Sequence, residues 1–72
     1  MNLTQINKNQ SVMIESLDGP QELVLRLAEL GFTQGEVIRI VGTNLFKSPL
    51  YVEVRGAVLA LRASEAMCIQ VR

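Results

Sequence analysis

The sequence contains no histidine and no tryptophan, and only three aromatic side chains, Phe32, Phe46 and Tyr51, occur among its 72 residues. Without histidine the chain lacks the most common general base, and no Gly-rich phosphate loop joins a strand to a helix. Paired carboxylates, such as Glu22 and Glu29, remain an open route to acid–base chemistry. Both are expected on a solvated helix face, where ordinary surface charge is the usual role. The residue types therefore predict that the protein is not an enzyme.

Cysteine is almost absent as well. The single Cys68 cannot form an intramolecular disulfide, which fits a reducing compartment. A lone thiol without histidine provides no dedicated ligand set for a soft or borderline metal ion. We expect Cys68 in a strand, where an inward side chain is more often a small buried hydrophobe than a metal ligand. No metal and no other cofactor is expected.

Net charge is also missing, because seven Lys and Arg balance seven Asp and Glu. A polyanion therefore meets no overall attractive field. Binding of single-stranded nucleic acid stays an alternative, because small barrels stack bases beside a basic groove. A local patch for it would consist of Arg39, Arg55, Arg62 and Lys47 with Tyr51. The chain also has no signal peptide and no run of about 20 apolar residues, so a soluble, cytoplasmic protein is expected.

A helix is predicted over residues 21–30. Asp18 can cap its start and Pro20 suits the first helical position. One face carries Leu23, Leu27 and Leu30, and Glu22 is spaced to pair with Arg26 on the polar side. Gly31 follows where a helix end requires a positive φ, and Phe32 can pack back on Leu27.

Five short strands are predicted around this helix, because β-branched and alternating runs end at turn residues. They cover residues 12–17, 36–41, 50–55, 57–62 and 68–71, and a helical turn over 64–67 is expected to be capped by Ser64. Only one connection is long enough for a parallel crossover. We therefore expect residues 1–72 to form a single domain, mainly β with one helix, as a small five-stranded antiparallel SH3-like barrel.

Two blocks have a more specific order and spacing. They read RLAELGFTQGEVIRI over residues 26–40 and LALRASEAMCIQV over 59–71. Together they resemble the FeoA family, whose pattern is roughly R-L-x-x-L-G-x-x-x-G-x-x-I-x-V followed by a-L-R-x-x-E-A-x-x-I-x-V. Leu3 and Ile6 stand at the family's usual apolar N-terminal positions. Similar SH3-like domains occur at the C-terminus of metal-dependent repressors of the diphtheria-toxin-repressor type, and these are the most easily confused relatives.

The resemblance implies a small cytosolic accessory protein of bacterial ferrous iron uptake. Such a protein binds and modulates the membrane transporter FeoB through its cytosolic part, and its partner recruits it to the inner face of the membrane. The chain departs from the family at its hairpin loop, where Asn44-Leu45-Phe46-Lys47-Ser48-Pro49 replaces a sequence close to A-P-L-G-D-P. A glycine that often precedes the first strand is also missing.

Protein binding is the function that the residues themselves favour. Apolar side chains at positions expected to be exposed would mark an interface if they cluster. Phe46 either contacts a partner or folds back as a plug over the open end of the barrel. A stand-alone SH3-like interaction module, such as a companion of a metal-dependent repressor, and pairing between copies through strand edges remain alternatives. The candidate partner-binding residues are Leu25, Leu45, Phe46, Lys47 and Tyr51.

Overall fold

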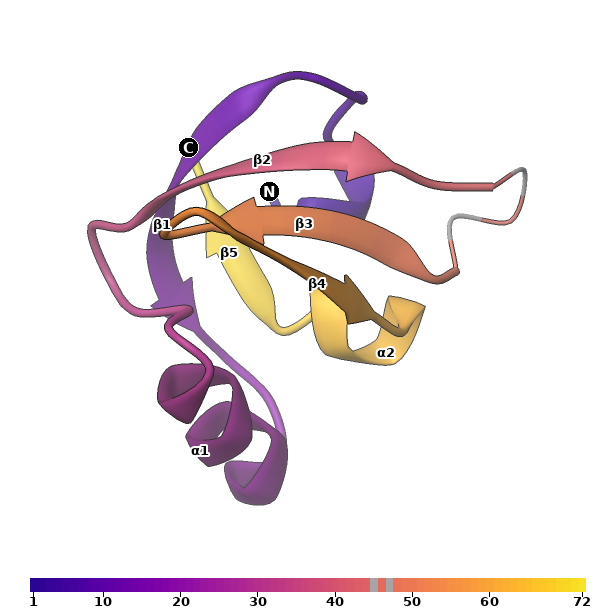
Figure 1. The fold of residues 1–72 in the computed structure, drawn as a ribbon. Helices are drawn as coiled ribbons and strands as arrows, with labels where there is room; N and C mark the ends of the chain where they lie inside the picture. The colour runs from indigo at the N-terminus through magenta and orange to yellow at the C-terminus, as the bar shows by residue number, and fades with distance from the viewer. Residues whose placement is uncertain (45, 47) are drawn as a thin grey trace.

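The computed structural model describes residues 1–44, 46 and 48–72. Its five strands form one antiparallel sheet in the order β4-β3-β2-β1-β5, which curves into the predicted SH3-like barrel (Figure 1). The mainly β fold with one longer helix is therefore confirmed. The strands are β1 (Ser11–Leu17), β2 (Val37–Gly42), β3 (Leu50–Val54), β4 (Ala57–Leu61) and β5 (Ile69–Val71).

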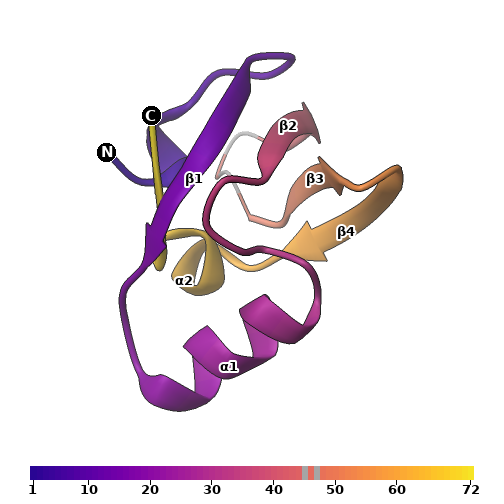
Figure 2. The same cartoon turned by 90° about the vertical axis from the view of Figure 1, so that its left-hand side faces the viewer.

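Strand β1 lies between β2 and the edge strand β5 and pairs with each over a different part of its length. Its first residues pair with β2, through Ser11–Arg39 and Val12–Ile38, and its later residues pair with β5. A register shift between Ile14 and Ser16 interrupts the β1–β5 ladder. Because a bulge bends a strand and increases its twist, β1 can pass from one partner to the other along its length (Figure 2).

The core lies inside the curved sheet and is almost entirely aliphatic. Alternation along β3 places Leu50, Val52 and Val54 inward and Tyr51 outward, as the sequence predicted. Phe32 is the one aromatic ring in the described core and is completely buried. Cys68 is also buried, in agreement with a small hydrophobe rather than an exposed thiol.

Helix α1 (Gln21–Glu29) covers one end of the barrel and stops in the predicted way. Gly31 has φ 105°, its N–H bonds to the Ala28 carbonyl at 3.1 Å, and the Phe32 N–H bonds to the Leu27 carbonyl at 3.0 Å. This pair of hydrogen bonds is a Schellman ending. It places Phe32 back in the core beneath the last turn.

Two predictions about α1 are wrong. Leu30 is the C-cap residue and is exposed rather than in the core, because the chain turns there and Phe32 fills the space. Pro20, not a side-chain cap from Asp18, occupies the N-cap position. Asp18 accepts a hydrogen bond from the Ser16 hydroxyl at 3.1 Å instead.

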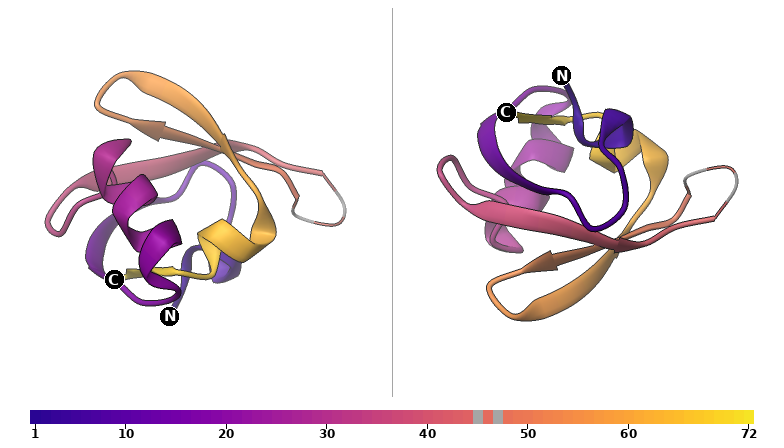
Figure 3. Two further views of the ribbon diagram at one scale, coloured as in Figure 1. Left: turned by 90° about the horizontal axis from the view of Figure 1, so that it is seen from below. Right: turned by 90° about the horizontal axis from the view of Figure 1, so that it is seen from above.

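The chain ends are held at the edge strand β5 (Figure 3). A short 3-10 helix, η1 (Leu3–Gln5), follows Asn2, whose side chain accepts from the Thr4 N–H at 2.9 Å. In return, Gln5 Oε1 accepts a hydrogen bond from the Asn2 N–H at 2.8 Å. The Val71 N–H bonds to the Met1 carbonyl at 2.8 Å, and Asn2 forms a bridge with Gln70. The N-terminal residues thus cover the outer edge of β5.

Candidate partner-binding surface

The hairpin loop, residues 43–49 between β2 and β3, presents Phe46 to solvent. Phe46 is 81% exposed, so its ring does not plug the barrel. Asn44 organises the turn, because its Oδ1 accepts from the Phe46 N–H at 2.9 Å and from the Ser48 N–H at 3.2 Å. Its Nδ2 donates to the Ser48 carbonyl at 2.6 Å. Leu45 and Lys47, also predicted to bind a partner, lie outside the described residues.

The base of the hairpin loop is attached to the second helix, α2 (Ala63–Ala66). The Ser48 hydroxyl accepts from the Ala63 N–H at 3.2 Å, across 15 residues of sequence. This bond satisfies one of the free N–H groups at the start of α2. The loop is therefore fixed at its base by Ser48 and shaped by Asn44, while Phe46 projects outward. Asn44 was not among the predicted site residues, although an asparagine in a loop is typical of an Asx turn and could have indicated this role.

Tyr51 lies on the outer face of the same hairpin. It is 45% exposed, and it stands opposite Gly42 in the β2–β3 ladder. A Cβ built at Gly42 would lie 3.5 Å from Tyr51 Cδ2, so the ring rests beside this glycine. Phe46 and Tyr51 are thus aromatic side chains on one hairpin, one at the loop and one on the adjacent strand.

Leu25 belongs to a different part of the molecule. It projects from the polar side of α1 and is 55% exposed, as expected from its position in the helix. The ribbon views place α1 apart from the hairpin loop, at another end of the barrel (Figures 1 and 3). The structure therefore does not bring Leu25 together with Phe46 and Tyr51 into one cluster.

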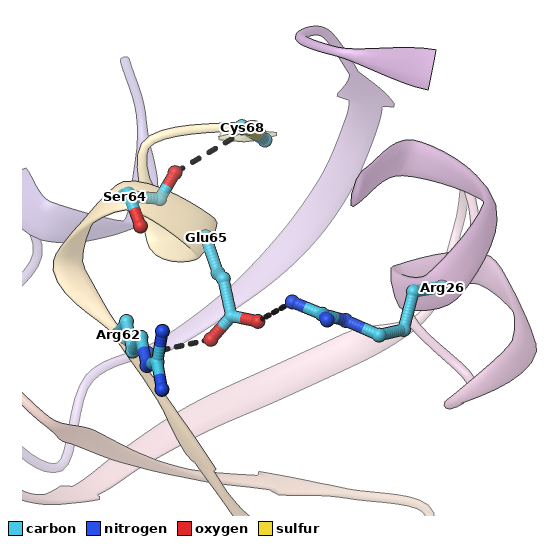
Figure 4. Close-up of polar contacts among 5 residues, drawn as sticks. All are labelled: Arg26, Arg62, Ser64, Glu65 and Cys68. Atoms are coloured by element: carbon cyan, nitrogen blue, oxygen red, sulfur yellow. Dashed lines mark hydrogen bonds and ion pairs between the residues drawn. The ribbon is translucent and has the colours of Figure 1, made fainter. Parts of the chain in front are cut away.

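The one buried carboxylate among the described residues is Glu65 in α2 (Figure 4). Its Oε1 accepts from the Arg62 N–H at 2.8 Å, and its Oε2 forms an ion pair with Arg26 Nη2. Arg26 was predicted to pair with Glu22 one turn away, and that prediction is wrong. Ser64 was predicted to cap α2, but Arg62 is the N-cap residue and the carboxylate of Glu65 supplies the capping acceptor.

Other polar contacts also have structural roles. Arg39 pairs with Glu53 at 3.1 Å and Arg55 with Glu36 at 3.1 Å, so two arginines of the suspected nucleic-acid patch already have carboxylate partners. The hydrogen bond to Glu36 and the negative charge of Glu36 raise the pKa of Arg55. Cys68 Sγ donates to the Ser64 carbonyl at 3.4 Å. These groups do not converge as catalytic groups would.

The described part of the chain has a surface without a pocket that could enclose a small substrate. Nor do three or more Cys, Asp or Glu side chains gather there as metal ligands would. Among the described residues, no helix has the length and apolar character needed to cross a bilayer. Large exposed apolar side chains occur on strands, on α1 and on the hairpin loop, among them Val58, Leu25 and Phe46.

Comparison with known proteins agrees with this architecture. The FeoA domain family matches residues 1–72. A Campylobacter jejuni protein, described as a candidate Fe(2+) transport protein A, is 28% identical over 71 residues, which cover 99% of this chain and 96% of that protein. The zinc-complexed FeoA of Stenotrophomonas maltophilia superposes with a TM-score of 0.89 at 34% identity, covering 100% of this chain and 89% of that one.

Metal-dependent repressors, the relatives most easily confused with this family, share the fold as well. A manganese-dependent transcriptional repressor superposes with a TM-score of 0.89, covering 99% of this chain and 40% of the repressor, but only 15% of residues are identical. At that identity the likeness concerns the fold alone. The family match extends over the whole chain, and the Schellman ending at Gly31 and the junction at Glu65 lie within the two sequence blocks that resemble the family. The chain therefore belongs to the FeoA family.

Proposed function

We propose that this protein is a cytoplasmic accessory factor of bacterial ferrous iron uptake, and that it binds and modulates the cytosolic part of an FeoB-like membrane transporter. Membership of the FeoA family and the iron-transport name of its Campylobacter jejuni relative support the pathway. Recruitment by the transporter would bring the protein to the inner face of the membrane. Residues 1–72 act as a single binding domain in this proposal.

The observation that carries the proposal is the exposure of Phe46 on a loop that is held in shape. A large aromatic ring in water gains free energy when a partner covers it, and such residues often dominate binding energy at an interface. Asn44 accepts a hydrogen bond from the Phe46 N–H, and Ser48 attaches the base of the loop to α2. Binding therefore costs less conformational entropy than it would from an unstructured segment.

Tyr51 extends this surface along the hairpin, and Leu45 and Lys47 are proposed to join it because they adjoin Phe46 in the sequence. Leu25 would contact the transporter from a separate face of the molecule. Binding rather than catalysis is proposed because Glu65, the buried carboxylate, is already committed to Arg62 and Arg26. Active sites normally show acid and base groups converging in a pocket.

A binding titration against the purified cytosolic part of FeoB tests the proposal. Phe46→Ala is expected to weaken binding at least about tenfold, the size typical of losing an interface anchor. Leu25→Ala is expected to have a smaller effect because it lies on another face. Val37→Ala is the matched control, since Val37 is 57% exposed at the far end of β2 from the hairpin loop.

Two outcomes would contradict the proposal. The intact protein would show no binding to FeoB, or Phe46→Ala would bind as tightly as the unchanged chain. Because Phe46 is exposed, its truncation should leave thermal unfolding unchanged, which separates a lost contact from a lost fold.

A further inference from the structure

The sheet has two edge strands, β4 and β5, and within the described residues another segment of the chain covers only β5. The N-terminal residues cover β5, through the Val71 N–H to Met1 carbonyl bond and the Asn2–Gln70 bridge. Strand β4 pairs with β3 on one side only. Within residues 1–44, 46 and 48–72, no other hydrogen bond involves the backbone of Ala57–Leu61. Both panels of Figure 3 show β4 at the margin of the ribbon, with no strand beyond it.

The open edge of β4 also lacks the features that normally prevent pairing. Natural edge strands carry charges, proline or a bulge, or they are covered by another segment. Strand β4 reads Ala-Val-Leu-Ala-Leu, which has no charged residue and no proline, and its ladder with β3 runs through five consecutive pairs without a register shift. It is therefore a regular, uncharged edge that is ready to accept another strand.

The hairpin geometry shows which backbone groups are free. The two-residue turn Arg55-Gly56, with φ 52° and 80°, closes on the pair Val54–Ala57. In such a hairpin this pair exchanges both hydrogen bonds, and the bonding direction then alternates along the strand. Ala57, Leu59 and Leu61 therefore bond toward β3. The N–H and C=O groups of Val58 and Ala60 point to the open edge.

We propose that β4 pairs with β4 of a second copy, antiparallel, about a two-fold axis at Leu59. This register places Val58 opposite Ala60 of the second copy, and the reverse. These are the two positions with free backbone groups, so each pair exchanges two hydrogen bonds. If the register shifted by one residue, the free backbone groups of one copy would face groups of the other copy that already bond to β3.

The side chains of β4 are also compatible with a two-fold axis at Leu59. Leu59 lies opposite Leu59 of the second copy. In the pairs on either side of the axis, a smaller residue lies opposite a larger one: Ala60 opposite Val58, and Ala57 opposite Leu61. Leu59 faces inward beside Val52 but stays partly exposed, because no strand follows β4. On the outer face, Val58 is 54% exposed and would approach Tyr51 of the second copy across Ala60. Strand β4 brings no charges of the same sign together.

Sedimentation velocity over a range of protein concentrations tests this pairing. The unchanged chain is expected to shift from monomer to dimer as concentration rises. Val58→Lys adds a charge at the open edge, and Ala60→Pro removes an outward N–H without removing a bond to β3. Both variants are expected to stay monomeric at concentrations where the unchanged chain is dimeric.

Val37→Lys is the matched control, because Val37 is exposed to a similar degree, 57% against 54% for Val58, but lies in the interior strand β2. It should dimerise like the unchanged chain. Amide exchange adds a second measurement: the N–H groups of Val58 and Ala60 should exchange more slowly as concentration rises. A monomer at all concentrations, or a dimer that survives Val58→Lys, would overturn the inference. So would a monomer whose binding to FeoB is lost in Val58→Lys, since the edge would then belong to the transporter.

Discussion

Glu65 joins two helices that are far apart in the sequence. Its carboxylate accepts from the backbone of Arg62 at the start of α2, and it pairs with Arg26 of α1, 39 residues away. The side chain of Glu65 is 12% exposed, whereas that of Arg26 is 58% exposed. The capping contact is therefore better protected from water than the guanidinium of the ion pair.

The first prediction follows from this asymmetry. Glu65→Ala leaves the Arg62 N–H without its acceptor and also removes the ion pair, so the free energy of unfolding should fall by about 1–3 kcal/mol. Arg26→Ala should cost less than about 1 kcal/mol, because exposed ion pairs contribute little. Glu65→Gln keeps an acceptor for the Arg62 N–H and should fall between the two. Urea unfolding of the three variants measures the order, and an equal loss in all three would contradict it.

At the scale of elements, the β3–β4 turn has a conformation that most residues avoid. Arg55 and Gly56 both have positive φ, which is the pattern of a type I′ turn and matches the twist of a hairpin. Arg55 was predicted to be the last residue of its strand, but it is the first residue of this turn. The alternating polar pattern continues through Arg55 and hides the boundary.

Replacing the turn glycine provides the second prediction. Gly56→Ala should lower the free energy of unfolding by about 1–2 kcal/mol, because an L-residue is strained at φ 80°. No atom lies within 4 Å of the added Cβ, so the loss would come from the backbone alone. Gly42→Ala is the matched control: φ is not positive there and the Cβ would lie 3.5 Å from the Tyr51 ring. That variant should change stability by less than about 0.5 kcal/mol.

Most elements could be predicted from local sequence because local chemistry determines them. The stop of α1 follows from Gly31 and the burial of Phe32, and the alternation of β3 follows from Leu50, Val52 and Val54. The start of α2 could not be predicted in the same way. Ser64 resembles a cap, yet the segment begins one residue earlier because Glu65 reaches back to Arg62 and Ser48 bonds Ala63.

For the whole molecule, zero net charge sets the expectation for polyanions. Seven positive side chains are matched by seven negative ones, and Arg39 and Arg55 have carboxylate partners. We therefore expect a single-stranded oligonucleotide to gain little electrostatic binding energy from this protein. Fluorescence anisotropy at low salt should show no tight binding. A submicromolar affinity that weakens steeply with added salt would contradict this prediction.

The chain by itself determined the fold class, the family and the exposure of Leu25 and Tyr51, because turn residues, alternation and helical periodicity act over a few neighbours. Tertiary structure decided the rest. It exposed Phe46, separated Leu25 from the hairpin, paired Arg26 with Glu65 and covered β5 while leaving β4 open. Each of these depends on which segments meet in space, and such contacts between distant residues leave little trace in local sequence.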